Sequence, residues 1–240
     1  HLNQFVEQAV SGVKDADGKA ARYYATDICD GISQGHDGIN YSLASRDMIA
    51  NMVEIHGNSI GFDGGVFIAS CDKSMPAMLM GIGKLKEMSA IVVTGGVMEA
   101  HKITPKYVEN DPACAINELL TLEQIGKFDA QEKRGEIPVE QLDYYKENAC
   151  PSCGACSFMG TASTMQVMAE ALGLMLPGTA LMPATAPELR LASYDAGKQL
   201  MNLVRQGIRA KDIVTKESFE NAIMVHAAIS GSTNATMHIP

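Results

Sequence analysis

The sequence predicts an α/β fold of three layers, in which a largely parallel sheet lies between helices. Two compact runs of apolar residues, 65–70 and 90–97, are typical of strands that are buried on both faces. A helical pattern separates them, so the two strands are expected to pair in parallel through a right-handed crossover. Polar residues follow the first run, at the strand end where open α/β sheets place their ligands.

The elements before and between these strands follow from local signals. Apolar spacing predicts a short helix over 1–13, and the stretch 20–28 is predicted to be a further strand. Ser42 can cap an amphipathic helix that extends to His56. Pro76 is expected to start the helix between the two strands, because proline is favoured in the first helical turn.

The region 102–148 differs in composition, since it is charged and is interrupted by Gly135 and Pro138. It is predicted to be a helical insertion, with helical stretches over 115–128 and 139–148. The segment 231–234 is expected to open a helix N-terminus that is suited to holding an anion. The other helices predicted after the insertion cover 164–174, 192–207 and 216–229.

The composition is that of an ordinary globular protein, with 46% hydrophobic and 20% charged residues among 240. A net charge of -9 argues against nucleic acid and anionic membranes as partners, and no apolar run is long enough to span a bilayer. Six cysteines, clustered rather than scattered, favour a reducing compartment, so a cytoplasmic location is expected. The chain begins at His1, and we expect it to be part of a longer protein.

Three of the six cysteines, Cys150, Cys153 and Cys156, lie in one short loop with proline and glycine between them. The loop is expected to lead into a helix N-terminus, where free N–H groups and the helix dipole favour thiolate. Its spacing suits a metal or iron–sulfur site, a redox dithiol, or packing without chemistry. The loop by itself does not decide among these three interpretations.

Two predicted strand ends carry acidic or thiol groups. Asp30 follows one strand, and Cys71, Asp72 and Lys73 follow the next. Carboxylates suit a hard cation such as Mg²⁺, whereas thiolates suit iron or zinc. Because an ammonium repels a cation, Lys73 is interpreted as an anion-binding residue, as an amine with a depressed pKa, or as a lysine converted to a carbamate.

Simpler interpretations compete with these. Asp30 precedes a glycine, a pair that is more often a turn than a ligand site. Cys29 and Cys114 lie in apolar surroundings and are expected to be small core residues. His36 is open to a catalytic role or to simple exposure in a loop. The many methionines are interpreted as core residues rather than ligands.

Several separate segments together resemble the dihydroxy-acid dehydratase / 6-phosphogluconate dehydratase family. The Cys-Asp-Lys sequence at 71–73 and the three-cysteine loop carry the resemblance most directly. The region between Glu99 and Asn148 is poorly matched. The matching segments are 29–38, 41–46, 71–73, 149–156, 170–178 and 231–234.

The resemblance implies an iron–sulfur cluster, [2Fe–2S] or [4Fe–4S], that is held by three cysteines from three motifs. It makes Cys71 and Cys156 two of these ligands. In the family the remaining ligand lies in a Pro-Cys-Asn motif just before a His-Leu pair, and this chain begins with that pair at His1. The resemblance therefore implies that residues 1–240 alone bind a cluster poorly and are inactive as a fragment.

The resemblance also makes Asp30 and Asp72 ligands of Mg²⁺, and it makes Lys73 a carbamylated lysine that coordinates the same ion. A further glutamate ligand and the serine that acts as base belong to the family's C-terminal domain. Residues 1–240 are thus expected to form the N-terminal, cluster- and metal-binding domain of a homodimer. In such an enzyme Mg²⁺ holds the substrate carboxylate and C2 hydroxyl, and iron acts as a Lewis acid for the C3 hydroxyl.

The expected activity is that of a hydro-lyase that dehydrates a 2,3-dihydroxy carboxylic acid to a 2-keto acid. The complete three-cysteine loop favours the dihydroxy-acid dehydratase of branched-chain amino-acid synthesis. The segment 160–165, where Ser163 replaces an asparagine that is frequent in that branch, is closer to dehydratases of sugar acids such as aldonates or 6-phosphogluconate. An alternative of another class is a non-enzymatic module, in which Cys150, Cys153 and Cys156 hold a structural Zn²⁺.

Overall fold

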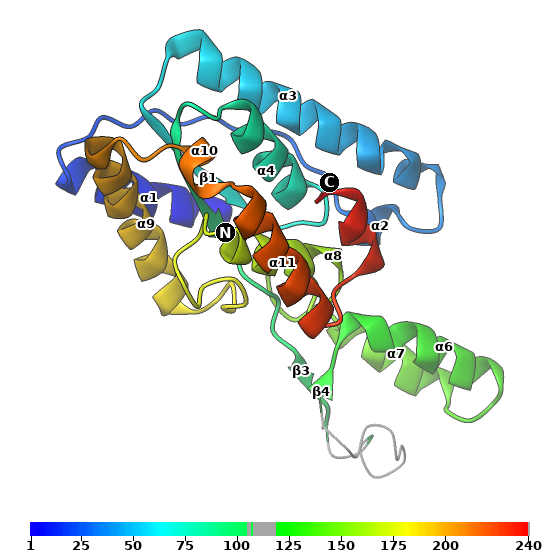
Figure 1. The fold of residues 1–240 in the computed structure, drawn as a ribbon. Helices are drawn as coiled ribbons and strands as arrows, with labels where there is room; N and C mark the ends of the chain where they lie inside the picture. Colours follow the sequence, from blue (N-terminus) through cyan, green and yellow to red (C-terminus); the bar gives the residue numbers. More distant parts are fainter. Residues whose placement is uncertain (105–106, 108–118, 240) are drawn as a thin grey trace.

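The structure, a computed structural model, describes residues 1–104, 107 and 119–239. Its centre is a parallel pair of strands, β1 (Gly64–Ala69) and β2 (Ser89–Thr94), which are connected by helix α4 (Ser74–Lys84) (Figure 1). A later segment extends this sheet, because the Val92 N–H donates to the Leu174 carbonyl at 2.7 Å. The predicted strand–helix–strand unit with parallel pairing is therefore confirmed.

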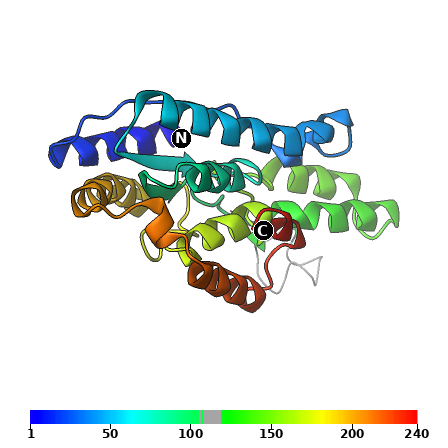
Figure 2. The same ribbon diagram turned by 45° about the horizontal axis from the view of Figure 1, so that its top comes forward.

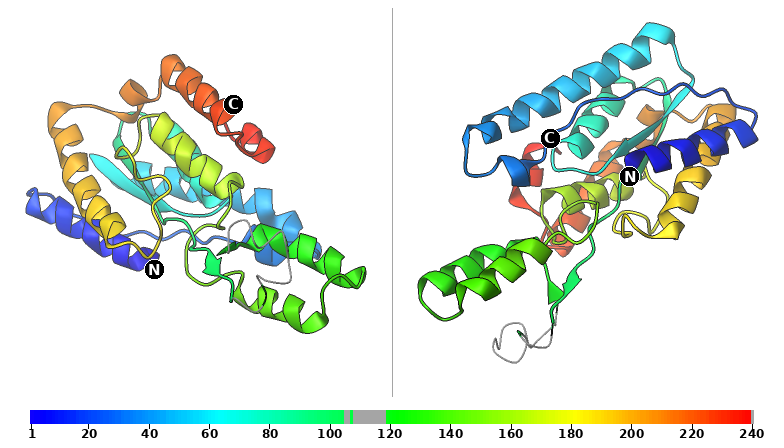
Figure 3. Two further views of the ribbon diagram at one scale, coloured as in Figure 1. Left: turned by 90° about the horizontal axis from the view of Figure 1, so that it is seen from below. Right: turned by 180° about the vertical axis from the view of Figure 1, so that it is seen from behind.

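Side chains of the two strands alternate between two helical layers, as in the predicted three-layer arrangement. One face packs against α1 (Leu2–Asp15) and α9 (Pro187–Gln206), and the other packs against α4 and α8 (Thr161–Ala171) (Figure 3). Helices α3 (Ser42–Ile60) and α11 (Lys216–Ala228) lie outermost, on opposite sides of the molecule (Figure 2). The first face is formed by Val66, Ile68, Ile91 and Val93, and the second by Phe67, Ala69, Ala90 and Val92.

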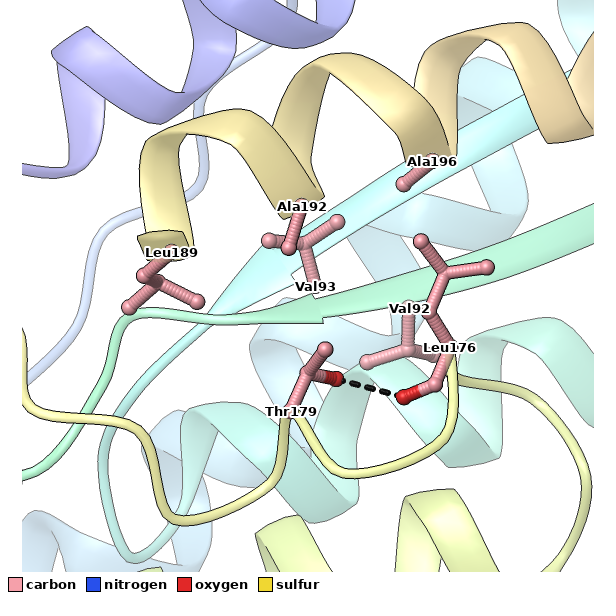
Figure 4. Close-up of a pocket in the computed structure, with 7 residues that line it drawn as sticks. All are labelled: Val92, Val93, Leu176, Thr179, Leu189, Ala192 and Ala196. Atoms are coloured by element: carbon pink, nitrogen blue, oxygen red, sulfur yellow. Dashed lines mark hydrogen bonds between the residues drawn. The ribbon is translucent and has the colours of Figure 1, made fainter. Parts of the chain in front are cut away.

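Helices α1 and α9 approach each other so closely that only glycine fits at their contact. A Cβ on Gly12 would lie 2.0 Å from the carbonyl oxygen of Tyr194. The first turns of α9 also cover the sheet, and Figure 4 shows Ala192 and Ala196 of this helix over Val93. The glycine contact thus holds α1 close to α9 on this face of the sheet.

The predicted strand over 20–28 is wrong, because residues 18–29 have no regular secondary structure. Most of these residues are exposed, and a cavity of about 670 Å³ is lined by this segment and by β1. An arginine and two adjacent tyrosines in the middle of the segment leave it little aliphatic surface to bury on a sheet. The segment leads instead to the short helices α2 (Asp30–Ser33) and η1 (Asp37–Tyr41).

The insertion projects from the rest of the molecule as a helical pair (Figures 1 and 3). A short antiparallel pair of strands, β3 (His101–Lys102) and β4 (Leu119–Leu120), leads into α6 (Ile125–Lys133) and α7 (Val139–Asn148). The buried side chains of this region form a separate cluster that does not join those of the central sheet. The insertion therefore has a small core of its own.

The two helices predicted in the insertion have different outcomes. The helix over 139–148 is confirmed at both ends. Of the helix predicted over 115–128, residues 115–118 lie outside the described residues, and the next two belong to β4. Helical structure begins only at η2 (Leu122–Gln124), which precedes α6.

The remaining helices are confirmed, with ends that differ by a few residues. Helix α9 begins at Pro187 rather than at 192, because proline at the first position needs no partner for an N–H group. Helix α11 follows Thr215, whose side chain accepts from the Ser218 N–H, and α10 (Ala210–Ile213) precedes it. None of the helices among the described residues is long and apolar enough to cross a membrane.

Candidate functional site

Asp30, Asp72 and Lys73 come together, although Asp30 is distant from the other two in sequence; we call them the carboxylate pocket. Asp30 is the first residue of α2, whereas Asp72 and Lys73 lie in the turn between β1 and α4. The Lys73 ammonium donates to Asp30 Oδ2 at 2.9 Å and also to Asp72 Oδ1. The Lys73 side chain is only 4% exposed, so the fold buries a cation between two carboxylates.

Each carboxylate of the pocket has a further hydrogen-bond donor. The Ser42 hydroxyl, at the start of α3, lies 2.9 and 2.8 Å from the two carboxylate oxygens of Asp30. The Asn234 amide donates to Asp72 Oδ1 at 3.2 Å and to the Thr161 hydroxyl at 3.1 Å. These donors orient the carboxylates, because a hydrogen bond to a carboxylate oxygen is directional.

Asn234 belongs to the segment that the sequence predicts to open an anion-binding helix. The segment forms a short 3₁₀ helix instead, η3 (Thr233–Met237). The residue before η3 is attached to α8, since the Ser232 N–H donates to Thr164 Oγ1 at 3.0 Å and the Ser232 hydroxyl lies 2.9 Å from that of Thr161. Asn234 of this segment therefore contacts the carboxylate pocket, while Ser232 attaches the segment to α8.

The charge of Lys73 is stabilised by its partners. Burial disfavours the charged form, but the hydrogen bonds to Asp30 and Asp72 outweigh burial and raise the pKa of the Lys73 amine. As an ammonium, Lys73 leaves the pocket with a net charge of minus one. A carbamate on Lys73 together with a bound Mg²⁺ leaves the same net charge, so the oxygen donors of this pocket fit that ion.

Two further residues of the pocket's surroundings, Arg46 and His238, were assigned no role from the sequence. His238 follows η3, is 8% exposed, and has its Nδ1 atom 3.0 Å from Nη1 of Arg46 in α3. Burial, followed by the positive charges of Lys73 and Arg46, lowers the pKa of His238 to about 4. In the sequence, only the position of His238 shortly after Asn234 could have indicated that it lies near the site.

Cys71 and Cys156 lie near the carboxylate pocket and near other thiols. Burial, and then the charge of Asp27, raises the pKa of Cys71 to about 12. Burial raises the pKa of Cys156 as well, with smaller contributions from Cys29 and Cys150. These mutual effects place four thiols from three separate segments in one neighbourhood, which the sequence spacing alone did not show.

The position of Cys156 depends on the backbone of the segment 150–156, which we call the cysteine loop. The Ala155 N–H donates to the Gly96 carbonyl at 2.9 Å, and the Met98 N–H donates to the Ala155 carbonyl at 2.7 Å. Helix α8 begins only at Thr161. The expectation of a thiolate stabilised by a helix N-terminus is therefore wrong for Cys156, whose pKa is raised.

Other sequence-based interpretations are decided by the structure. Cys29 is exposed, so its expected place in the core is wrong, and Cys114 lies outside the described residues. His36 is exposed, accepts from the Gly38 N–H at 3.0 Å, and has its other ring nitrogen 3.1 Å from the Ile32 carbonyl. Its ring therefore organises the local turn that leads into η1.

In the part of the chain that the structure describes, no three histidine, cysteine, aspartate or glutamate side chains converge closely enough to hold a metal ion. Cys150, Cys153 and Cys156 therefore form no preassembled tetrahedral site, and the structural-zinc alternative gains no support. The carboxylate pocket supplies two carboxylates and one lysine, a set that becomes a three-oxygen site only after modification of the lysine.

Comparison with known proteins gives a consistent family. A family model described as "Dihydroxy-acid/6-phosphogluconate dehydratase N-terminal" matches residues 1–240. The chain is similar to "Dihydroxy-acid dehydratase" of Caldicellulosiruptor bescii, at 40% identity over 241 residues, which is 100% of this chain and 41% of the relative. Proteins of the same name from Syntrophobacter fumaroxidans and Caldanaerobacter subterraneus are 39% and 40% identical, again over 100% of this chain and 41% of each relative. The chain thus spans about two fifths of the length of these curated relatives.

Proposed function

This chain belongs to the dihydroxy-acid/6-phosphogluconate dehydratase family, and we propose that it is the N-terminal portion of a dihydroxy-acid dehydratase. Such a hydro-lyase removes water from a 2,3-dihydroxy carboxylic acid and releases a 2-keto acid. The observation that carries the proposal is the convergence of Asp30 and Asp72 on Lys73, directly beside Cys71. The names of the full-length relatives support the same activity.

The proposal assigns Mg²⁺ to the carboxylate pocket, with Asp30, Asp72 and a carbamylated Lys73 as ligands. Two features support it. The carboxylates are already oriented by Ser42 and Asn234, and exchange of the ammonium for a carbamate and a divalent cation keeps the charge of the pocket unchanged. Hard oxygen donors are the ligands that Mg²⁺ prefers in proteins.

The proposal assigns the iron–sulfur cluster to the thiols of Cys71 and Cys156, together with a ligand from outside residues 1–240. A thiol ligand must lose its proton on binding, and iron supplies the positive charge that makes this favourable although burial raises both pKa values. Since Cys71 and Asp72 are adjacent, the two inorganic centres would lie side by side. One substrate could then contact both.

When bound, Mg²⁺ would acidify the C2 proton and the cluster would act as a Lewis acid toward the C3 hydroxyl. The residues of this chain position the metal ligands. Asp30 and Asp72 are held by Ser42 and Asn234, so little reorganisation is needed when the substrate carboxylate and C2 hydroxyl enter. The base that removes the C2 proton is assigned to a serine outside residues 1–240.

The sugar-acid alternative rests on the segment 160–165, and above all on Ser163. In the structure Ser163 is buried in α8, with 3% of its surface exposed. A residue in that position affects packing more directly than it affects substrate choice. The family description nevertheless names both dehydratase branches, so substrate choice is part of the test below.

The proposal extends to assembly and location. We expect a homodimer in a reducing, cytoplasmic compartment. The free thiols of Cys71 and Cys156 favour such a compartment, because iron–sulfur ligation requires reduced cysteines. The outer side of α3 exposes Met48 and Ile55, an apolar surface that a second subunit or the rest of the protein would cover.

The decisive experiment uses the full-length protein, purified without air. Iron and sulfide content and turnover of 2,3-dihydroxyisovalerate and of a panel of aldonic acids are measured for the wild type, Cys156→Ser and Cys153→Ser. We expect iron, sulfide and turnover of the dihydroxy acid in the wild type, and loss of all three in Cys156→Ser. Cys153→Ser is the matched control in the same loop and should keep the cluster.

Two outcomes would contradict the proposal. Turnover of aldonic acids alone would move the protein to the sugar-acid branch. Stoichiometric zinc without iron, and no turnover of any of these acids, would favour a structural module instead.

A further inference from the structure

His238 is a buried side chain that the proposed chemistry has not used. It directly follows η3, the same short element that presents Asn234 to Asp72, and the C-terminal end of the chain lies near α2 (Figure 1). Its exposed fraction is 8%. The ring lies near the carboxylate pocket, because its partner Arg46 follows Ser42, which binds Asp30, by about one turn of α3, and Asn234 of the adjoining η3 binds Asp72.

The hydrogen bond from Arg46 fixes the protonation state of this ring. Arg46 Nη1 lies 3.0 Å from Nδ1 of His238, and a guanidinium nitrogen can only donate. Nδ1 of His238 must therefore be the acceptor and carry no proton. The neutral ring then bears its single proton on Nε2, which makes Nε2–H a donor.

This donor meets no acceptor among residues 1–104, 107 and 119–239. Nε2 of His238 is buried and makes no hydrogen bond with any of the described residues. A buried N–H without a partner is unfavourable, and such groups in folded proteins usually serve a ligand or an ordered water. The nearby carboxylates already accept from other groups: Asp30 accepts from Ser42 and Lys73, and Asp72 accepts from Lys73 and Asn234.

We propose that the Nε2–H of His238 donates a hydrogen bond to an oxygen of the substrate when that substrate is bound at the carboxylate pocket. The inference rests on the proposed function, because it takes a 2,3-dihydroxy acid or its 2-keto acid product as the ligand. Arg46 is the positioning residue, since its guanidinium keeps the proton of His238 on Nε2. The ligand thus contacts the carboxylate pocket on one side and a neutral donor on the other.

A neutral donor suits this place for an electrostatic reason. The guanidinium of Arg46 already lies against the ring, so it would repel a positive charge on His238. A neutral N–H can bind a carboxylate or hydroxyl oxygen without adding charge. The bond also has a fixed direction, because the ring is held by burial and by Arg46.

The test compares two substitutions in the full-length, metal-loaded protein. In His238→Asn the amide oxygen can still accept from Arg46, but no donor reaches the Nε2 position. In His238→Gln the amide nitrogen replaces Nε2. Binding of the product 2-ketoisovalerate is measured by isothermal titration calorimetry, without turnover, and KM and kcat are measured with 2,3-dihydroxyisovalerate.

We expect His238→Asn to weaken 2-ketoisovalerate binding about 10- to 100-fold, the usual effect of losing one hydrogen bond to a charged oxygen. Most of the loss in kcat/KM should then appear in KM. His238→Gln should recover most of the affinity. His226→Asn is the control, because His226 Nε2 lies 3.0 Å from the Ser232 carbonyl within the chain; it should lower the melting temperature and leave the Kd unchanged.

The inference fails if His238→Asn binds 2-ketoisovalerate as tightly as the wild type, or if Gln and Asn weaken it equally. A crystal structure of the wild type with 2-ketoisovalerate gives a result that does not depend on any variant folding. It should place Nε2 within about 3.2 Å of a ligand oxygen, and a larger separation overturns the inference. A wild type that neither binds this acid nor dehydrates its precursor would instead contradict the proposed function.

Discussion

The carboxylate pocket and the cysteine loop are neighbours, but the chain holds them in different ways. Asp30, Asp72 and Lys73 are fixed by side-chain hydrogen bonds that come from α2, α3, the β1–α4 turn and η3. The cysteine loop is fixed by its backbone, through Ala155 and the residues that follow β2. Its thiols at Cys150 and Cys153 are exposed.

The difference reflects the chemistry of the two donor types. A carboxylate is charged at neutral pH and cannot be removed from water without a partner, so the pocket must be satisfied in advance. A thiol whose pKa is raised by burial, such as Cys71 at about 12, stays neutral and packs as a small apolar group. A sulfur site therefore needs only a correctly placed backbone, whereas an oxygen site needs a network of side chains.

The strongest way to break the pocket is Lys73→Met. It leaves two carboxylates facing each other without their cation, so we expect the metal-free, full-length protein to lose about 3 kcal/mol of unfolding free energy in urea titration. Lys84→Met is the matched control, because Lys84 forms a half-exposed pair with Glu54 that contributes less than about 1 kcal/mol. Equal losses in both variants would show that the pocket is not held by charge.

The corresponding change in the cysteine loop is Gly154→Ala. Gly154 has φ of 120°, and an added Cβ would lie 2.5 Å from the carbonyl carbon of Val97, so backbone must move and we expect a loss of about 3 kcal/mol. Gly135→Ala tests strain alone. Gly135 has φ of 72° and nothing within 4 Å of a Cβ, and its loss should be about 1 kcal/mol. A mild effect at Gly154 would mean that the loop is not fixed by its backbone.

His238 gives the pocket a dependence on pH. Its pKa is about 4 in the folded protein and 6.5 as the ordinary value, so the unfolded chain takes up a proton first as the pH falls. Stability linked to His238 is complete above pH 6.5 and is lost as the pH falls from 6.5 toward 4. Between pH 7 and pH 5 the wild type should lose about 2 kcal/mol more than His238→Gln, by urea titration of the metal-free protein. If the unfolding free energies of the wild type and His238→Gln change equally with pH, His238 is not the group responsible for the pH dependence.

A smaller effect is expected for Ser42→Ala, which removes the hydroxyl that orients Asp30. Asp30 keeps Lys73 as a partner, so we expect a loss of about 1 kcal/mol in stability and about tenfold weaker Mg²⁺ binding by calorimetry. Ser45→Ala, one turn along α3, removes only a bond from its hydroxyl to the Ser42 carbonyl and should leave Mg²⁺ binding unchanged. Weaker binding in both variants would point to α3 as a whole rather than to the Ser42 hydroxyl.

Much of the central fold was predictable because its signals are local. The strands β1 and β2 are short apolar runs, and α7 is bounded by Pro138 and by the cysteine loop. The prediction of a strand over 20–28 was wrong because the apolar residues of this segment resemble those of a strand. Whether a strand forms there depends on a neighbouring strand that could bury them. The helix predicted in the insertion was wrong at β4 for the same reason, since the pairing of β4 with β3 is not a local property of the sequence.

For the site, the sequence by itself determined which residues can act as metal or cluster ligands: Asp30, Cys71, Asp72, Lys73 and Cys156. Only the tertiary structure decided that Asp30 reaches Lys73, that Cys29 is exposed beside the other thiols, and that the Nε2 donor of His238 meets no acceptor in the described part of the chain. The physical reason is that residue type fixes chemical capacity, whereas burial, charge and hydrogen-bond partners depend on segments that are far apart in the chain.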